Sequence, residues 1–149
     1  MLRIFLILFL SIVIVGCSAA NFVVKPYSTL EVKSAHNINP DSNGRPSPVV
    51  FYVFELTSDT IFSNQDFFSL YENPEKVLGP DLVNKFEFSL TPDSVENYQA
   101  SMNPKTEFIG LVAAFRDIEN SNWRQVIKVD KTGYNTYEVL IDDLSLVVK

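Results

Sequence analysis

Strand-like patterns of hydrophobic and polar residues cover most of the chain beyond its first 29 positions. Residues 85–90 (KFEFSL) alternate strictly and residues 30–35 alternate over a shorter stretch, which indicates strands with one face buried and one in water. Residues 49–56 and 106–117 are apolar at odd and even positions alike, as is typical of strands covered on both sides. Further strands are predicted over residues 123–129, 134–141 and 145–148.

One helical segment is predicted, and it follows the strand at 49–56. Ser63-Asn64 is expected to cap its first turn. Residues 67–71 (FFSLY) place apolar side chains at helical spacing, and the dipeptide Asn73-Pro74 is expected to end the helix. Residues 75–78 can add one further turn.

The order of these elements favours an all-β fold, a two-sheet β-sandwich with a short inserted helical element. Its strands, about seven, do not alternate with crossover helices as those of an α/β fold do. Residues 94–98 interrupt the strand pattern and are expected to form a brief helix or an irregular crossing. Gly110, inside the apolar segment 106–117, indicates close backbone packing at that point.

Residues 37–48 are expected to form a loop, because these twelve residues are rich in Asn, Asp, Ser, Gly and Pro. Hairpin connections are usually about two to five residues long, so this loop is longer than connectivity requires. Long loops in compact domains are usually functional or else disordered. The segment is therefore a candidate binding loop, with a mobile surface loop as the alternative.

The N-terminus has the pattern of an export signal. Arg3 precedes twelve uncharged residues at 4–15, and Gly16-Cys17 follows them. A helix over this run would span about 18 Å, too short for the roughly 30 Å hydrocarbon core of a bilayer. The run is therefore predicted to be a signal peptide that is removed.

The segment Ile14-Val15-Gly16-Cys17 resembles the lipobox of bacterial lipoproteins. That resemblance implies cleavage between Gly16 and Cys17, with an N-acyl chain and an S-diacylglycerol on Cys17. Ser18 stands where an Asp would usually retain such a protein in the inner membrane, which implies sorting to the outer membrane. An ordinary secretory signal with a chance Cys is the alternative. The predicted organisation is a signal peptide at 1–16, a lipidated tether at 17–26 and a β-sandwich domain at 27–149.

Charge and composition argue against several classes of function. The chain has 12 basic and 18 acidic side chains, a net charge of −6, which disfavours nucleic acid and anionic lipid headgroups as partners. The sole Cys allows no internal disulfide. His36 is the single histidine, no Gly-x-Ser-x-Gly motif occurs, and no His or Cys spacing indicates zinc. We expect no enzyme activity, no metal, no cofactor besides the attached lipid, and no small-molecule substrate.

The dipeptides Arg116-Asp117 and Trp123-Arg124 flank a polar turn. We interpret them as structural: the arginines are expected to pair with Asp117 or Glu119 and pin the hairpin, while the Trp covers a sheet edge. The alternative is a binding hot spot, because Trp and Arg are enriched in such places.

Together these features resemble the TssJ family (SciN or VasD), the outer-membrane lipoproteins of type VI secretion systems. The likeness covers essentially the whole predicted mature chain. Its most specific parts are residues 66–70 (DFFSL) and the combination of residues 114–117 (AFRD) with Trp123-Arg124. One departure lies in the strand at 49–56, where relatives often carry an Arg and this chain has Phe51 and Tyr52.

The resemblance implies a transthyretin-like β-sandwich in the periplasm, anchored to the outer membrane. It also implies the role of a structural adaptor that binds the periplasmic C-terminal region of the inner-membrane protein TssM and so joins both membranes. In the family, the loop between the first two strands makes an essential contact with that partner. Carried onto this sequence, the partner-binding residues are Asn39, Pro40, Asp41, Ser42, Asn43, Gly44, Arg45 and Pro46.

Two other functions stay open on the residues alone. The sandwich can bind a small ligand or an envelope polymer, with the aromatic helix as a lid, and thermal-shift screening against glycans and peptides would reveal such a ligand. An envelope hydrolase would lose its activity when a serine or His36 is replaced.

Overall fold

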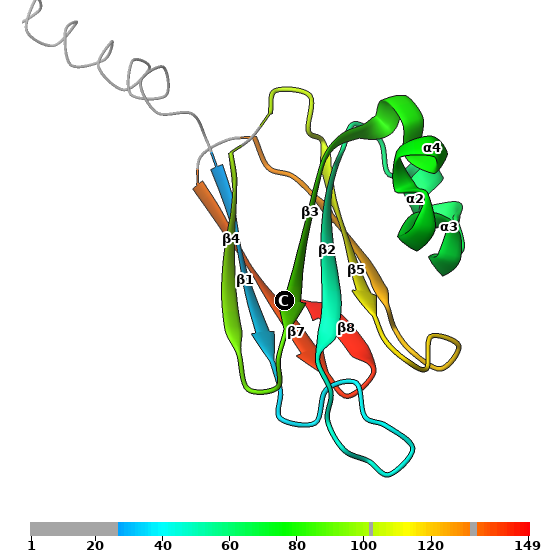
Figure 1. Cartoon of the computed structure of the whole chain (residues 1–149). Helices are drawn as coiled ribbons and strands as arrows, with labels where there is room; N and C mark the ends of the chain where they lie inside the picture. The colour runs from blue at the N-terminus through cyan, green and yellow to red at the C-terminus, as the bar shows by residue number, and fades with distance from the viewer. Residues whose placement is uncertain (1–26, 102, 132–133) are drawn as a thin grey trace, which may run out of the picture.

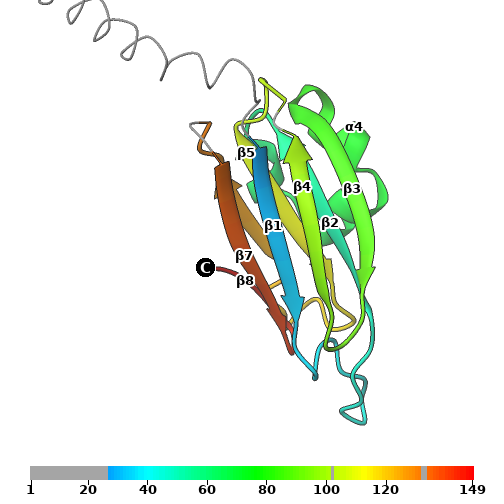
Figure 2. The ribbon, with the colours of Figure 1, turned by 90° about the vertical axis from the view of Figure 1, so that its left-hand side faces the viewer.

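The computed structural model describes residues 27–101, 103–131 and 134–149, which form two facing four-stranded sheets (Figure 1). The strands are β1 (Tyr27–Ser34), β2 (Val49–Leu56), β3 (Leu82–Leu90), β4 (Val95–Ser101), β5 (Phe108–Ala114), β6 (Arg124–Lys128), β7 (Tyr134–Asp142) and β8 (Ser145–Val148). Their order is β4-β1-β7-β8 in the first sheet and β3-β2-β5-β6 in the second. Neighbours are antiparallel except β1 and β7, which run parallel; Figure 2 shows β1 between β4 and β7.

The predicted all-β sandwich is confirmed, with eight strands in the described residues instead of about seven. The additional strand is β4, so the brief helix or irregular crossing predicted for residues 94–98 is wrong. β4 is an edge strand paired with β1, and among residues 95–99 all side chains except Tyr98 are exposed. A strand with both faces largely in water lacks the alternation that reveals a strand. Strand ends also differ: β1 covers Tyr27–Ser34 rather than residues 30–35, β3 begins at Leu82 rather than Lys85, and β5 is shorter than 106–117 at both ends.

The main core lies between the sheets and is filled by one face of each. Leu30 and Val32 of β1 are fully buried, because alternate side chains of a strand point to the same face. Phe51 and Val53 of β2 face them from the second sheet. The other buried members are Ile38, Val49, Leu90, Ile109, Leu111, Ala113, Phe115, Ile127, Val129, Val139, Ile141 and Leu146.

The helical segment covers the outer face of the second sheet, away from the first (Figure 1). It consists of α2 (Thr60–Asn64), α3 (Phe67–Glu72), α4 (Pro74–Leu78) and a single 3-10 turn, η1 (Gly79–Asp81). This cover explains why β2 is apolar on both faces, as its pattern indicates. The second core comprises Tyr52, Phe54, Leu56, Phe62, Leu70, Leu78 and Val112.

The predicted cap at Ser63-Asn64 is wrong, because these residues lie within α2. The helix over residues 67–71 and its end at Asn73-Pro74 are confirmed by α3, and the further turn at 75–78 is confirmed by α4. Gln65 has an extended backbone (φ −84°, ψ 153°) and ends α2. Asp66 is the N-cap of α3: its Oδ1 accepts from the Ser69 N–H at 3.0 Å and its Oδ2 from the Ser69 hydroxyl at 2.7 Å. Pro74 begins α4, since its fixed φ suits a first helical position.

A glycine of β5 and an arginine of β6 hold the helical segment against the sheet. A Cβ on Gly110 would lie 2.6 Å from a ring carbon of Phe62, so the predicted close packing at this glycine is confirmed. The Arg124 guanidinium donates to the carbonyls of Phe62 at 2.8 Å and Gln65 at 2.7 Å. It also lies 4.7 Å from the centre of the Trp123 ring, and burial lowers the pKa of Arg124.

The predicted pairing of Arg116 and Arg124 with Asp117 or Glu119 is therefore wrong within the described residues. Arg124 caps carbonyls of the helical segment instead, and the Asp117 carboxylate accepts hydrogen bonds from Asn120. Trp123 does cover part of the second sheet, with its ring 5.4 Å from that of Phe67 in an edge-on arrangement. The pair Trp123-Arg124 thus joins β6 to the helices rather than closing its own hairpin.

The start of β1 and the loop between β1 and β2 lie at opposite ends of the sandwich (Figure 1). At about 3.3 Å per residue, the eight residues of β1 separate these ends by about 26 Å. The predicted signal peptide at 1–16, the lipidation site Cys17 and the tether at 17–26 lie outside the described residues. Within the described part of the chain, no helix is both long and apolar enough to cross a bilayer.

Candidate partner-binding loop

The loop between β1 and β2 is fastened to the sandwich at its base. Ile38 is fully buried in the main core, and the next residue, Asn39, is only 3% exposed. The Asn39 N–H donates to the Asp143 carbonyl at 2.8 Å, and its Nδ2 donates to the Pro48 carbonyl at 2.8 Å. Its Oδ1 accepts the backbone N–H of Arg116 at 2.8 Å. One residue thus ties the loop to its own far end and to the turns that follow β5 and β7.

The tip of the loop, residues 41–46, is closed by a turn that Asp41 organises. The Asp41 N–H donates to the Arg45 carbonyl at 2.9 Å, and the Gly44 N–H donates to the Asp41 carbonyl at 2.8 Å. The Asp41 Oδ1 accepts the backbone N–H groups of Asn43 at 2.8 Å and Arg45 at 3.0 Å. Its Oδ2 accepts Arg45 Nε at 2.9 Å and lies 2.8 Å from Arg45 Nη2. Gly44 adopts a φ of +75°, which a residue without Cβ reaches without strain.

These hydrogen bonds favour the ionised form of Asp41. The backbone N–H groups of Arg45 and Asn43, followed by the Arg45 side chain, lower the pKa of Asp41, and the charge of Arg116 acts in the same direction. An ionised carboxylate is an acceptor only, so it satisfies all of these donors at once near neutral pH. The tip therefore has a defined shape before any partner contacts it.

The structure divides the eight predicted partner-binding residues into a base and a tip. Asn39 uses both side-chain polar groups inside the protein, so it positions the loop and is not free to contact another molecule. It has a left-handed backbone (φ +48°), which Asn adopts more readily than most residues. Pro40 and Asp41 are partly exposed. The exposed residues are Ser42, Asn43, Gly44, Arg45 and Pro46.

A surface hollow of about 610 Å³ lies beside the tip, between the loop and the turn after β5. Sequence reasoning did not place this turn next to the loop, since 77 residues separate Asn39 from Arg116. The only sequence feature that pointed to this turn as part of a binding site was the alternative interpretation of Arg116 as part of a hot spot. The hollow is lined by Pro40, Asp41, Ser42, Asn43, Arg45, Arg116, Asp117 and Leu144.

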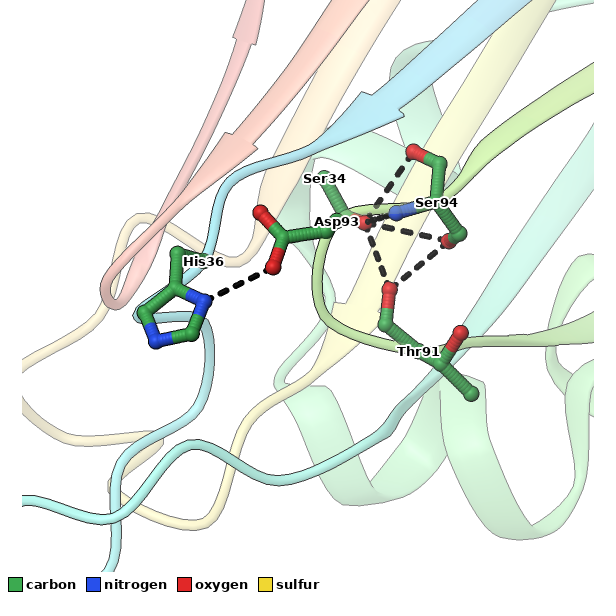
Figure 3. Close-up of polar contacts among 5 residues, drawn as sticks. All are labelled: Ser34, His36, Thr91, Asp93 and Ser94. Atoms are coloured by element: carbon green, nitrogen blue, oxygen red, sulfur yellow. Dashed lines mark hydrogen bonds and ion pairs between the residues drawn. The ribbon is translucent and has the colours of Figure 1, made fainter.

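A second polar cluster fixes the start of the loop to the turn between β3 and β4 (Figure 3). His36 Nδ1 lies 2.7 Å from Asp93 Oδ2, and both side chains are largely exposed. The Ser34 hydroxyl donates to the Thr91 carbonyl at 2.6 Å and lies 3.0 Å from the Ser94 hydroxyl.

Both serines of this cluster bond within the turn and not to the imidazole, whereas a serine nucleophile needs its base within hydrogen-bond reach. The described residues also hold no group of three or more His, Cys, Asp and Glu side chains able to bind a metal ion. The His36–Asp93 contact therefore has a structural use, as a second attachment of the loop.

Comparisons with known proteins point to one family. The model of the type VI secretion lipoproteins VasD, EvfM and TssJ matches residues 26–144. The crystal structure of the type VI secretion lipoprotein TssJ1 from Pseudomonas aeruginosa is similar to this chain with a TM-score of 0.82 and 28% identity, over 85% of this chain and 96% of that one. Among curated proteins, nothing matches.

Two further solved structures contain a chain of the same fold. One is a type VI membrane complex, with a TM-score of 0.74 and 19% identity over 85% of this chain and 98% of that one. The other is the structure of the TssM C-terminal domain (869–1107) from EAEC, with a TM-score of 0.70 and 21% identity over 81% and 98%. At these identities the likeness concerns the fold.

Proposed function

This chain belongs to the type VI secretion lipoprotein family, and on that premise we propose that it is a structural adaptor that holds the periplasmic C-terminal region of a TssM-like inner-membrane protein at the outer membrane. The partner binds through the tip of the β1–β2 loop, residues 41–46. Chains of the same fold occur in structures of a type VI membrane complex and of the TssM C-terminal domain, which supports a partner within such an assembly.

The observation that carries this proposal is the closed, exposed tip on a buried base. Association costs free energy for every loop that must be ordered, typically about 0.5–1.5 kcal/mol for each immobilised flexible side chain. Here the Asp41 turn holds the backbone of Asn43 and Arg45 in place already, and Asn39 fixes the turn to the sandwich. A partner therefore meets a rigid polar surface and loses little free energy in ordering it.

The proposed anchor fits the position of this loop. We place the acyl chains on Cys17, in the tether that precedes β1, while the loop lies at the opposite end of the sandwich (Figure 1). Ten tether residues span at most about 36 Å when extended. With the anchor before β1 and the loop at the opposite end, the tip can extend away from the outer membrane into the periplasm. One acyl chain binds a membrane only marginally, and three chains make release negligible.

Replacing the tip tests the binding proposal. In the full-length lipidated protein, residues 41–46 are exchanged for a Gly-Ser linker of the same length while Asn39 and Pro48 are kept. We expect binding to the partner's periplasmic domain to fall at least about 100-fold, since the whole contact surface is lost. The melting temperature changes little because the base is intact. Retained binding would remove the loop from the account.

A matched control addresses exposed aromatic residues elsewhere. Phe68 and Tyr71 of α3 are 59% and 41% exposed, and the double replacement by Ser should leave partner binding at the wild-type level. Loss of binding in this control, with the tip variant still binding, would move the interface to the helical segment.

The anchor has its own test. The variant Cys17→Ser should leave the outer-membrane fraction, and Ser18→Asp should be lipidated but retained in the inner membrane. If the Cys17→Ser protein still sediments with outer membrane, acylation is not what holds it there.

A further inference from the structure

The side chain of Arg116 lines the hollow at the loop tip, where its charge acts on Asp41, but none of the ion pairs found among the described residues includes it. Its backbone N–H is held by Asn39, so the residue has a fixed position. The side chain is exposed, and the guanidinium makes none of the hydrogen bonds or ion pairs found among the described residues. The five N–H donors of this guanidinium are thus open to another molecule, although Asp41 and Asp117 also line the hollow.

Those two carboxylates are already occupied by other donors. Asp41 accepts from the backbone of Asn43 and from the backbone and side chain of Arg45. Both oxygens of Asp117 accept from the Asn120 side chain, and Oδ1 also accepts the Asn120 N–H. The acceptors of the hollow are therefore satisfied internally, while Arg116 and the outer edge of Arg45, which is 76% exposed, offer donors.

We propose that this hollow receives a carboxylate side chain of the partner protein, bound by Arg116 and flanked by Arg45. A guanidinium binds a carboxylate through two parallel hydrogen bonds, and its planar set of donors loses less entropy for each bond formed than a lysine ammonium does. The hollow, about 610 Å³, is larger than one carboxylate and accommodates the neighbouring backbone of the segment that carries it. This inference rests on the proposed function, because it assigns chemistry to the same loop end.

An acidic ligand is favoured at this hollow only, and not by the charge of the chain as a whole. Its net charge is −6, so a general attraction for acidic proteins is not expected. Recognition of a carboxylate here depends on the local pair of arginines. Replacing either arginine should therefore change affinity, whereas removing a distant positive charge should not.

The test measures binding of the full-length lipidated protein in detergent to the periplasmic domain of the TssM-like partner. Arg116→Gln removes the charge but keeps the backbone N–H that Asn39 accepts, and Arg116→Glu reverses the charge. Lys76→Gln in α4, an exposed cation on the helical segment, is the matched control. We expect Arg116→Gln to raise Kd about tenfold or more and Arg116→Glu to raise it further, with Lys76→Gln unchanged. Arg116→Gln should also reduce the dependence of Kd on salt.

A charge-swap experiment identifies the carboxylate of the partner. It also distinguishes failure of the carboxylate inference from failure of the proposed function. Single Asp→Arg and Glu→Arg variants of the partner domain are paired with Arg116→Glu, and one of them should restore binding. If Arg116→Gln and Arg116→Glu bind as the wild type while the tip replacement abolishes binding, the carboxylate inference is overturned and the proposed function stands. If the tip replacement binds normally, the proposed function itself fails. Unchanged melting temperatures of the two Arg116 variants show that folding is not the cause of any loss.

Discussion

The two segments that flank β2 are held to the sandwich in opposite ways. The loop before β2 is attached by polar groups, with Asn39 at its base and Asp41 at its tip. The helical segment after β2 is attached mainly by apolar burial, with Phe62 fully buried and Arg124 capping its carbonyls. One segment adds a surface to the fold, and the other completes the core of the second sheet.

This contrast indicates where the sequence can change without destabilising the fold. The exposed tip buries little apolar area, so its residues are free to be shaped by recognition. Removing the helical segment would uncover Tyr52 and Phe54, which are 6% and 1% exposed when it is present. At about 25 cal/mol per Å² of apolar area, such exposure destabilises a domain strongly. The aromatic helix is therefore part of the fold, whereas the loop is the segment that we propose binds the partner.

The largest expected effect on stability comes from Phe62. Phe62→Ala removes a fully buried ring between α2 and the second sheet and should lower the free energy of unfolding by about 3–5 kcal/mol. Denaturant titration measures this change in the free energy of unfolding. Phe68→Ala, on an exposed neighbour, should change it by less than about 0.5 kcal/mol. Equal effects of the two variants would show that the ring of Phe62 does not pack between α2 and the second sheet.

The base of the loop is the next most sensitive position. Asn39→Ala leaves the Pro48 carbonyl and the Arg116 N–H without their partner and places Ala at a positive φ, so unfolding should be easier by about 2–4 kcal/mol. Asn39→Asp keeps the acceptor for the Arg116 N–H and should lower the free energy of unfolding by less. A stable Asn39→Ala protein would contradict the polar attachment of the loop.

Close packing at Gly110 predicts a smaller, context-dependent loss. Gly110→Ala brings a Cβ against the Phe62 ring, and overpacking of this kind costs about 1–3 kcal/mol. In a Phe62→Leu background the same change should cost clearly less, because the ring is gone. A double-mutant cycle checks the coupling between the two residues, and additive effects would rule it out.

Acid should loosen the loop tip but not the helices. The pKa of Asp41 is lowered by its N–H donors, so the stabilisation it provides is complete above its unfolded value of 3.8 and is lost as pH falls through the lower folded value. The pKa of Asp66 is lowered in the same sense by Ser69, but α3 is also held by the burial of Leu70. Amide NMR of Asn43, Gly44 and Arg45 should be constant from neutral pH down to about pH 4 and change below it. If these amide signals depend on pH in Asp41→Asn as they do in the wild type, the assignment of the change to Asp41 is contradicted.

Strand pattern and composition predict the sandwich because half-buried strands carry an alternating signal. The edge strand β4 carries no such signal, since pairing with β1 and not burial defines it. The break at Gln65 and the cap at Asp66 depend on how the segment folds onto the sheet, which the helical spacing of residues 67–71 does not encode.

The candidate site shows the same limit. Loop length and composition single out residues 37–48, and the family resemblance narrows them to 39–46. The split into a buried Asn39 and an exposed tip depends on contacts with Asp143 and Arg116, far away in sequence. The predicted ion pairs of the arginines are wrong for a related reason. Local charge spacing favoured Asp117 and Glu119, whereas the fold supplies Arg124 with the carbonyls of α2.

Hydrogen exchange of the full-length lipidated protein, with and without the partner's periplasmic domain, shows which of the two segments contacts the partner. We expect slower exchange on binding at residues 41–45 and in the turn that begins at Arg116, with no change across α2, α3 and α4. Protection confined to the helical segment, with the loop tip unaffected, would contradict it.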